Sequence, residues 1–465
     1  MKEGRVMGNN KLKILLVRPP RIKQAVTLGE FMYAEPIGLE IVYAVLKESY
    51  EVQILDLMIA TENFEKTCEA FKPDVVGITS LCIDVKKVKE IARRTKEFNK
   101  DIVTVVGGTQ AYLRPQSFFD DQMDHVFNYT TRNNLIELFN HIAQSQTPGL
   151  IDGILSKVHG YKSTDVFGRN EYIVPDRTST EKYRKNYSYL GFKPCAIMQT
   201  SLGCSKNCDF CLRWRIEGAK EEDIDLECII KQIQDIVEYN IMIFDNDFLN
   251  NKERLEKFCD RLEALKINKN FICYASVKSI CAHPDTIRRM AKNGLKAVLV
   301  GYETFNQEEM IKYKKKSTVS DSFEAAKILK DIGIDCWASF MLHPDWDKQD
   351  FKHFKKYIKE LKPEIATFSP LTPFPNLPLY EQYKDRLLFD ETDYESWSFG
   401  KVSIKPSKMT LRQYYGEVLK TILFINLRMN SAPYMVKRFG YSTLFRIGIG
   451  SIKVLPTYIK LMFKS

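Results

Sequence analysis

In Gly203-Cys204-Ser205-Lys206-Asn207-Cys208-Asp209-Phe210-Cys211, three cysteines are spaced as C-x3-C-x2-C, directly after a short apolar run at residues 196–200. Soft thiolate ligands suit iron–sulfur clusters, and three thiolates on a cubane of four irons leave one iron open to a small chelating molecule. A structural zinc site needs four ligands. The nearest other cysteines, Cys195 and Cys228, form no second C-x2-C pair. The spacing therefore favours a cubane cluster over zinc or over three unrelated core cysteines.

Around this loop, residues 191–380 repeat a strand–helix pattern. Apolar runs typical of strands lie at residues 196–200, 241–245, 271–275, 297–301, 336–342 and 365–369, and amphipathic helices follow them. Six such units predict a partial (β/α)6 barrel of the TIM type. Because barrel chemistry lies at the carboxyl ends of the strands, the cysteine loop occupies the expected position after the first strand.

Polar side chains also end the later strands of this barrel. Asp245, Ser276, Glu303 and His343 are the candidates for contact with a bound ligand. A carboxylate such as Glu303 suits a ribose hydroxyl or an ammonium group. Helix caps and turns are an equal alternative for the neighbouring acids Asp247 and Asp345, and His343 could equally cap a turn.

Upstream, residues 11–146 alternate strands and helices in the pattern of a doubly wound, Rossmann-like α/β domain. Strands are expected at residues 11–20, 52–57, 74–80 and 102–106, and helices at 36–46, 85–98 and 133–145. Ligands on such sheets bind outside the carboxyl ends of the strands. The candidate positions there are Arg18, Thr79, Ser80, Gly107, Gly108 and Thr109. Residues 147–190 are polar and rich in turn formers, which predicts a linker.

These motifs resemble the radical S-adenosylmethionine (SAM) enzymes that carry an N-terminal cobalamin-binding domain. The cysteine spacing matches their cluster loop, and Gly301-Tyr302-Glu303 matches their Gly-x-Glu element. Residues 372–380 match their Thr-Pro-x-Pro-Gly-Thr-x-Leu-Tyr element, with Asn376-Leu377 in place of Gly-Thr. In the first domain the matching stretches are residues 36–39, 77–80 and 106–109. Pro344-Asp345-Trp346, before an acidic helix, is most similar to hopanoid C-3 methylase-like proteins.

The resemblance implies that Cys204, Cys208 and Cys211 hold a 4Fe–4S cluster whose open iron binds SAM. It implies SAM contacts at Phe210, Asp245, Ser276, Glu303 and His343, and cobalamin at the six strand-end positions of the first domain. The Asp-x-His-x-x-Gly motif is absent, and His125 and His141 are expected in ordinary packing or surface roles, so the cobalamin should lack a histidine on cobalt. A flavodoxin-like domain that binds nothing is the alternative for this region.

The function implied is methylation of an unactivated carbon of an apolar, possibly lipid, substrate. A radical SAM enzyme of the same architecture that cyclises, couples carbons or oxidises is the first alternative. A cobalamin or cluster sensor is the second. One-electron reduction of the cluster calls for a donor of flavodoxin or ferredoxin type, and the chemistry is anaerobic.

Composition agrees with a protein of a reducing compartment. The 465 residues, 44% of them hydrophobic, are enough for two or three domains with real cores. The spacing of the eleven cysteines suggests no set of disulfide bonds, which argues against a secreted protein. We expect no signal peptide, since the first apolar run, at residues 14–17, is too short. No apolar stretch approaches a membrane span of about 18 residues, so a cytoplasmic location is expected.

The final region, residues 381–465, is predicted to be helical and basic. From residue 401 onward it has twelve Lys or Arg and a single acid, Glu417, which accounts for the whole net charge of +10. Arg446, Lys453 and Lys460 recur every seven residues on one helical face, and Pro456 should kink or split that helix. Such a segment favours an anionic membrane surface, here the inner face, over nucleic acid. A helical cap that packs on the barrel is the alternative.

Overall fold

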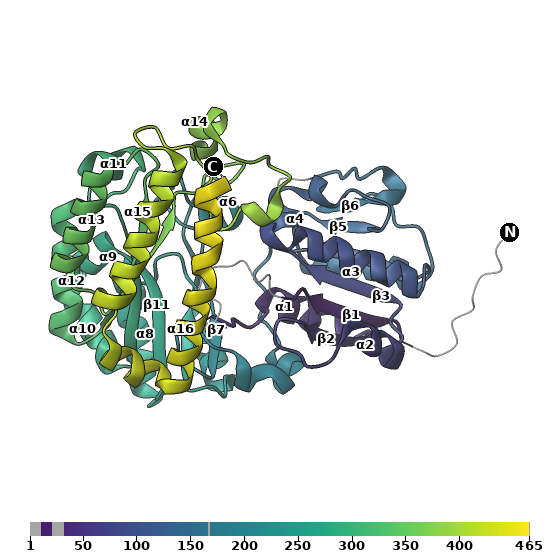
Figure 1. Cartoon of the computed structure of the whole chain (residues 1–465). Helices are drawn as coiled ribbons and strands as arrows, with labels where there is room; N and C mark the ends of the chain where they lie inside the picture. Colours follow the sequence, from purple (N-terminus) through teal and green to yellow (C-terminus); the bar gives the residue numbers. More distant parts are fainter. Residues whose placement is uncertain (1–10, 21–31, 166–167, 465) are drawn as a thin grey trace. The chain divides into compact units, whose positions relative to one another are not determined.

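The computed structural model describes residues 11–20, 32–165 and 168–464, which form two compact units. The first unit contains the described residues up to 20, Glu35–Asn186 and the short segment Glu391–Ser396. The second contains Tyr187–Asp390, Trp397–Ser465 and a few residues before Glu35. Figure 1 shows the elements of both units.

The first unit is built on a six-stranded sheet in the order β2-β1-β3-β4-β5-β6. The strands are β1 (Lys13–Arg18), β2 (Glu51–Asp56), β3 (Val75–Thr79), β4 (Val103–Gly107), β5 (His125–Phe127) and β6 (Ile154–Ser156). All neighbours are parallel except β5 and β6. The helices are α1 (Ile37–Leu46), α2 (Phe64–Phe71), α3 (Val85–Phe98), α4 (Thr109–Leu113) and α5 (Arg132–Ala143).

Alternation along β1 explains why helices cover both faces of this sheet. Leu15 and Val17 belong to one hydrophobic cluster, with α2 and α3, whereas Ile14 and Leu16 belong to a second, with α1 and α5. A strand buried on both faces reads as a continuous apolar run, as β1 does. The predicted doubly wound fold is confirmed.

The segment predicted as a linker is more ordered than its composition indicated. Its three-residue strand β6 extends the first sheet, and turns of 3-10 helix at Arg177–Asn186 pack on the same unit. Arg184 anchors these turns by an ion pair of 2.6 Å with the buried Glu35. A strand of three residues is too short to leave a periodic signal in sequence.

The second unit contains the predicted partial barrel. Its six parallel strands stand in the order β14-β13-β12-β11-β10-β7, so neighbours in the sheet are neighbours in the strand–helix series. They are β7 (Cys195–Met198), β10 (Asn240–Ile243), β11 (Asn270–Ser276), β12 (Leu295–Glu303), β13 (Asp335–Leu342) and β14 (Ile365–Pro370). The covering helices are α7 (Leu226–Asp235), α8 (Lys252–Ala264), α10 (Pro284–Lys292), α12 (Val319–Ile332) and α13 (Lys348–Leu361).

The C-terminal region packs on this barrel through α15 (Leu411–Phe424) and α16 (Ala432–Lys464). Tyr458 donates to the carbonyl of Gly400 at 2.7 Å, and Phe439 meets Trp337 edge to face. The helix is interrupted at Gly440, with φ of +72°, and it continues through Pro456. Of the two outcomes predicted for Pro456, a kink or a split, the split is therefore wrong. Glycine adopts a positive φ without steric cost, so the break falls there.

The basic helical face and the absence of a membrane span were also expected. The side chains of Arg446 and Lys453, two of the three predicted to share a basic face, lie outside the described residues. Within the described part of the chain, no helix combines the length and the apolar character needed to cross a bilayer.

Candidate active site

The three cysteines lie on one loop whose shape the backbone maintains. Gly203 has φ of +80°, and a Cβ there would overlap the carbonyl of Lys220. The amide of Cys204 donates to the carbonyl of Gly218 at 3.0 Å, and the Trp214 indole donates to the carbonyl of Cys208 at 2.9 Å. None of these contacts uses a cysteine sulfur, so all three thiols remain available as ligands.

The donor set fits a cluster with one thiolate per iron. Within the described residues, no group of three His, Cys, Asp or Glu side chains converges on one point as a single metal ion would require. A cubane does not require convergence, because each cysteine binds a different iron. Burial raises the pKa of the Cys208 thiol to about 11, against the opposing charge of Lys315. Metal binding must therefore supply the stabilisation that makes the Cys208 thiolate form.

A lysine inside the loop ties it to the barrel. Lys206 donates to Ser276 Oγ at 2.7 Å and to Ser279 Oγ at 3.2 Å, and it forms an ion pair with Asp247. The Asp247 carboxylate also accepts the amide of Ser276 at 2.9 Å. Ser276, a predicted SAM contact, is thus joined to the loop between Cys204 and Cys208. Sequence reasoning missed Lys206, although its place between two ligands was a usable signal.

Asp245 shapes the turn that leads from β7 toward the loop. Its fully buried carboxylate accepts the amides of Thr200 at 2.6 Å and Ser201 at 3.1 Å, and it pairs with Arg254 at 3.3 Å. These partners give Asp245 a positioning role. Its predicted contact with SAM stays a prediction.

Glu303, Phe210 and a buried lysine gather beside the cysteines. Glu303 ends β12 with φ of +63° and a side chain that is mostly buried. Lys315 Nζ lies 3.1 Å from Glu303 Oε1, donates to the Gly301 carbonyl at 3.1 Å, and stands 5.9 Å from the centre of the Phe210 ring. Burial opposes the charge of Lys315, yet the carboxylate of Glu303 beside it raises its pKa.

This arrangement places one ammonium and one carboxylate next to the cluster loop. Backbone strain at a non-glycine residue with positive φ, as at Glu303, is typical of functional sites. The sequence did not single out Lys315, because it belongs to the run Lys314-Lys315-Lys316. A run of lysines is normally expected on the solvent-exposed surface.

His343 has a local structural partner on each ring nitrogen. Its Nδ1 accepts the amide of Asp345 at 3.1 Å, and its Nε2 lies 3.2 Å from the Tyr383 hydroxyl. Burial lowers its pKa to about 4, so the imidazole is neutral at physiological pH. Asp345 in turn pairs with Arg386. These contacts match the turn-capping alternative, and a contact of His343 with SAM stays a prediction.

In the first unit, the predicted cobalamin positions meet where β3 and β4 end. Ser80 Oγ donates to the Gly107 carbonyl at 2.7 Å, and the amide of Gln110 donates to the Ser80 carbonyl at 3.1 Å. Gly108 has φ of +94°, and a Cβ there would lie 2.7 Å from Ser80 N and 2.8 Å from Thr79 Oγ1. Only a residue without a Cβ therefore lets this turn pack against the end of β3. Contact of these positions with cobalamin stays a prediction.

Arg18 and His125 both have partners within this unit, and a contact of Arg18 with cobalamin stays a prediction. Arg18, at the end of β1, pairs with the buried Asp56 at 3.3 Å. His125 lies 2.8 Å from Ser156 Oγ across β5 and β6, and burial lowers its pKa to about 4, as expected for a packing residue.

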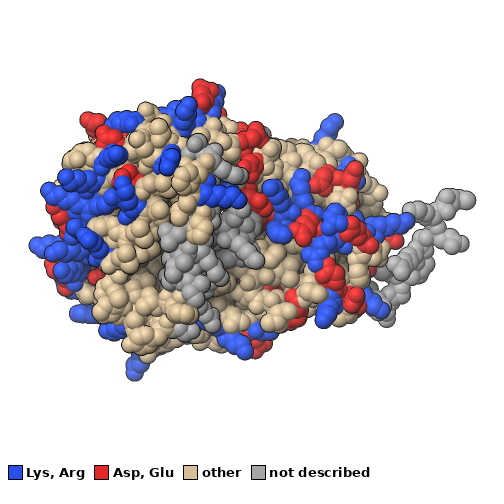
Figure 2. Space-filling model, in the orientation of Figure 1, with Lys and Arg blue, Asp and Glu red and all other residues tan. Residues whose placement is uncertain are grey.

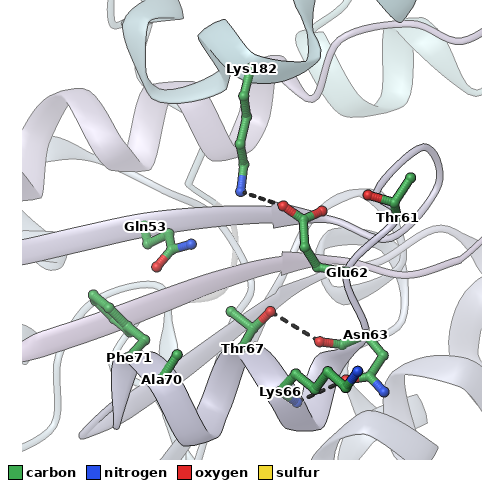
Figure 3. A pocket seen from close by; sticks show the side chains of 9 residues that line it. All are labelled: Gln53, Thr61, Glu62, Asn63, Lys66, Thr67, Ala70, Phe71 and Lys182. Atoms are coloured by element: carbon green, nitrogen blue, oxygen red, sulfur yellow. Dashed lines mark hydrogen bonds and ion pairs between the residues drawn. The ribbon is translucent and has the colours of Figure 1, made fainter.

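A separate pocket of about 580 Å³ lies against β2 and α2 (Figure 3). Lys182 crosses it to pair with Glu62 at 3.4 Å, and Thr67 bonds the backbone of Asn63, which caps α2. The pocket contains none of the predicted cobalamin positions. We assign no ligand to it.

Comparison with known families gives one match in each unit. The Radical SAM superfamily model matches residues 198–358, and the B12 binding domain model matches residues 31–134. The chain is a radical SAM enzyme with a B12-binding domain. The predicted recognition, fold and cofactors, a 4Fe–4S cluster with SAM and cobalamin, are confirmed.

Relatives of this radical SAM enzyme include the hopanoid C-3 methylase of Methylococcus capsulatus. The two are 23% identical over 84% of this chain and 76% of that protein. The anaerobic magnesium-protoporphyrin IX monomethyl ester cyclase of Rubrivivax gelatinosus is 24% identical over 81% of this chain and 70% of its own length.

Two solved structures share the fold. The cobalamin-dependent radical enzyme OxsB, with aqua-cobalamin and SAM bound, superposes with a TM-score of 0.71 at 14% identity, over 96% of this chain and 72% of its own. The radical SAM methyltransferase TsrM from Kitasatospora setae, with cobalamin and a 4Fe–4S cluster bound, gives 0.64 at 16% identity, over 81% and 78%.

Proposed function

We propose that this radical SAM enzyme methylates an unactivated carbon of an apolar substrate, with cobalamin as the methyl carrier. The observation that carries the proposal is that one chain contains both a cluster loop and a B12-binding domain. One is a loop with three free cysteines at the carboxyl end of the first barrel strand, and the other is a B12-binding sheet whose Gly108 turn packs closely on Ser80 and Thr79. The hopanoid C-3 methylase, a relative along most of both chains, supports methyl transfer and an apolar, lipid-like substrate class.

The residues of the chain have separable tasks in this proposal. When bound, the cluster and SAM would supply the radical chemistry for hydrogen abstraction from the substrate carbon, and methylcobalamin would supply the methyl group. Cys204, Cys208 and Cys211 would hold the cluster. Lys206 and Asp247 keep their loop on the barrel, and Asp245 sets the turn before it.

The remaining assignments concern SAM and the corrin. Phe210 would face the adenine, and the Glu303 carboxylate would accept an ammonium or a ribose hydroxyl, with Lys315 holding that carboxylate in place. Thr79 and residues 107–109 would receive the corrin beside Ser80, whose own hydroxyl braces the turn.

A second candidate function is cyclisation or oxidation without methyl transfer. The cyclase of Rubrivivax gelatinosus matches 81% of this chain, about as much as the methylase does. Both reactions begin with the same hydrogen abstraction, so the products of SAM distinguish them.

The test is incubation of the reconstituted, anaerobic enzyme with SAM carrying a trideuterated methyl group, a strong reductant and an extract of apolar lipids. Methylation should give both 5′-deoxyadenosine and S-adenosylhomocysteine, together with a lipid that has gained the labelled methyl group. Formation of 5′-deoxyadenosine alone would instead establish the second function. A sensor would produce neither in quantity.

We further propose that the C-terminal region rests on an anionic membrane surface, at the cytoplasmic face. Leu427 is 78% exposed and Phe463 67% exposed, and Arg412 lies over the Phe463 ring at 4.7 Å. Exposed apolar side chains next to cations suit the interface of anionic lipids. Packing of Tyr458 and Phe439 on the barrel leaves these side chains outward, so the packed helix and the membrane contact are compatible.

Basic side chains extend beyond this region, as Figure 2 shows over the edge that carries α12 and α13. This positive surface would also suit an acidic electron donor of flavodoxin or ferredoxin type, which the cluster needs for reduction.

Replacing Leu427 and Phe463 with aspartate should lower binding to vesicles of phosphatidylglycerol and phosphatidylcholine about tenfold or more at low salt. Each change removes apolar side-chain area that the membrane would bury, and it adds a negative charge that the anionic lipid headgroups repel. Co-sedimentation with vesicles measures the effect. Val237→Asp is the matched control, because Val237 is 83% exposed and follows α7 on the barrel. Wild-type protein that ignores these vesicles at low salt would contradict the proposal.

A further inference from the structure

Six residues that follow the barrel in sequence fold with the B12-binding unit. This segment, Glu391–Ser396, is here named the strap. Glu395 pairs with Lys86 of α3 at 3.3 Å, and Glu391 forms an ion pair with Arg114. The carbonyl of Tyr394 accepts from the Cys82 thiol at 3.9 Å, and its side chain packs on the hydrophobic cluster that contains Val76 and Val106.

Both loops that the strap touches carry predicted cobalamin positions. Cys82 begins the 3-10 turn Cys82–Asp84, two residues after Ser80. Arg114 directly follows α4, which begins at Thr109 after the Gly107-Gly108 turn. The two loops also bond each other, since Ser80 bonds Gly107 and Gln110. The strap therefore contacts both of the loops that carry the predicted cobalamin positions.

We propose that the strap is part of the cobalamin site and positions these two loops for binding. Loops held in the bound conformation lose less conformational freedom when the ligand arrives, which raises affinity. Contacts at three points along these six residues, with Lys86, Arg114 and Cys82, provide this constraint. Residues beyond the barrel would then control cobalamin retention. The proposal rests on cobalamin binding by this unit and is independent of the substrate and of the reaction outcome.

The test reverses the two charges of the strap in the full-length, anaerobically purified protein. Glu391→Arg with Glu395→Lys should lower the affinity for hydroxocobalamin about tenfold, since two attractions become repulsions next to the binding loops. Equilibrium titration followed by visible absorbance measures it. Iron, acid-labile sulfide and SAM binding should remain at wild-type levels, because the cysteine loop belongs to the other unit.

The decisive experiment restores the two ion pairs of the strap. Adding Arg114→Glu and Lys86→Glu to the reversed strap recreates both pairs with opposite polarity and should recover most of the lost affinity. Glu381→Arg is the matched control, because Glu381 forms an exposed pair of 3.0 Å with Lys384 in the other unit. The proposal would be overturned if the variant with the reversed strap bound hydroxocobalamin with wild-type affinity. It would also be overturned if the restoring changes did not recover the lost affinity. A wild-type protein that binds no hydroxocobalamin would overturn the cobalamin assignment itself, and one that binds it but transfers no methyl group would leave the strap proposal standing.

Discussion

Replacing Cys208 with alanine is expected to give a folded protein that assembles no stable 4Fe–4S cluster and cleaves SAM only at background level. Two cysteines remain on the loop, and a cubane held at two corners leaves two irons open to solvent and loss. The loop itself should persist, because its bonds from Cys204, Trp214 and Lys206 do not involve the Cys208 sulfur. Iron and sulfide content after reconstitution, and 5′-deoxyadenosine formed with SAM and a reductant, measure the effect.

Cys228→Ala is the control for this change. Cys228 is a half-buried free cysteine in α7, and its sulfur has only a weak contact of 3.6 Å with the Gln232 amide. The control variant should hold as much iron and sulfide as the wild type. Equal loss of iron in both variants, or an anaerobically purified wild type that contains zinc in place of iron and sulfide, would contradict the cluster assignment.

Gly108→Val should lower the affinity for hydroxocobalamin about tenfold to a hundredfold and leave the iron content unchanged. The backbone of Gly108, with φ of +94° and ψ of −176°, lies in a region that is essentially restricted to glycine, and strain there costs about 1–3 kcal/mol. The new side chain would also collide with Ser80 N and Thr79 Oγ1. The turn between β4 and α4 must move, and with it the predicted corrin contact.

Gly38→Ala is the matched control for this prediction. Gly38 lies inside α1, and a Cβ there would meet no atom within 4 Å. Alanine should stabilise the helix by up to about 1 kcal/mol and leave cobalamin binding intact. Titration with hydroxocobalamin and thermal unfolding distinguish the two variants. Normal binding by Gly108→Val would show that this turn does not receive the corrin.

The interactions around the candidate site could be predicted only in part. Phe210 and Glu303 were singled out by motif and do lie beside Lys315 and the cysteine loop. Lys315 was missed, because exposed and buried lysines look alike in sequence, and Lys206 was missed although it stands between two of the cysteines. Asp245 was expected at a ligand, which stays a prediction, and its bonds to Thr200, Ser201 and Arg254 were not foreseen. A strand-end acid bonds whichever backbone amides the fold brings near, and that choice has no local signature.

The sequence by itself determined the two cofactor units. Cysteine spacing and the alternation of apolar strands with amphipathic helices are local patterns, and local periodicity is enough to specify a doubly wound sheet and a run of β/α units. Only the tertiary structure decided which distant residues meet. Lys206 and Ser276 stand 70 positions apart, and Cys82 and Tyr394 stand 312 apart. Such contacts depend on which strand ends share an edge and where the chain returns, so the Lys315–Glu303 pair and the strap exist only in the folded protein.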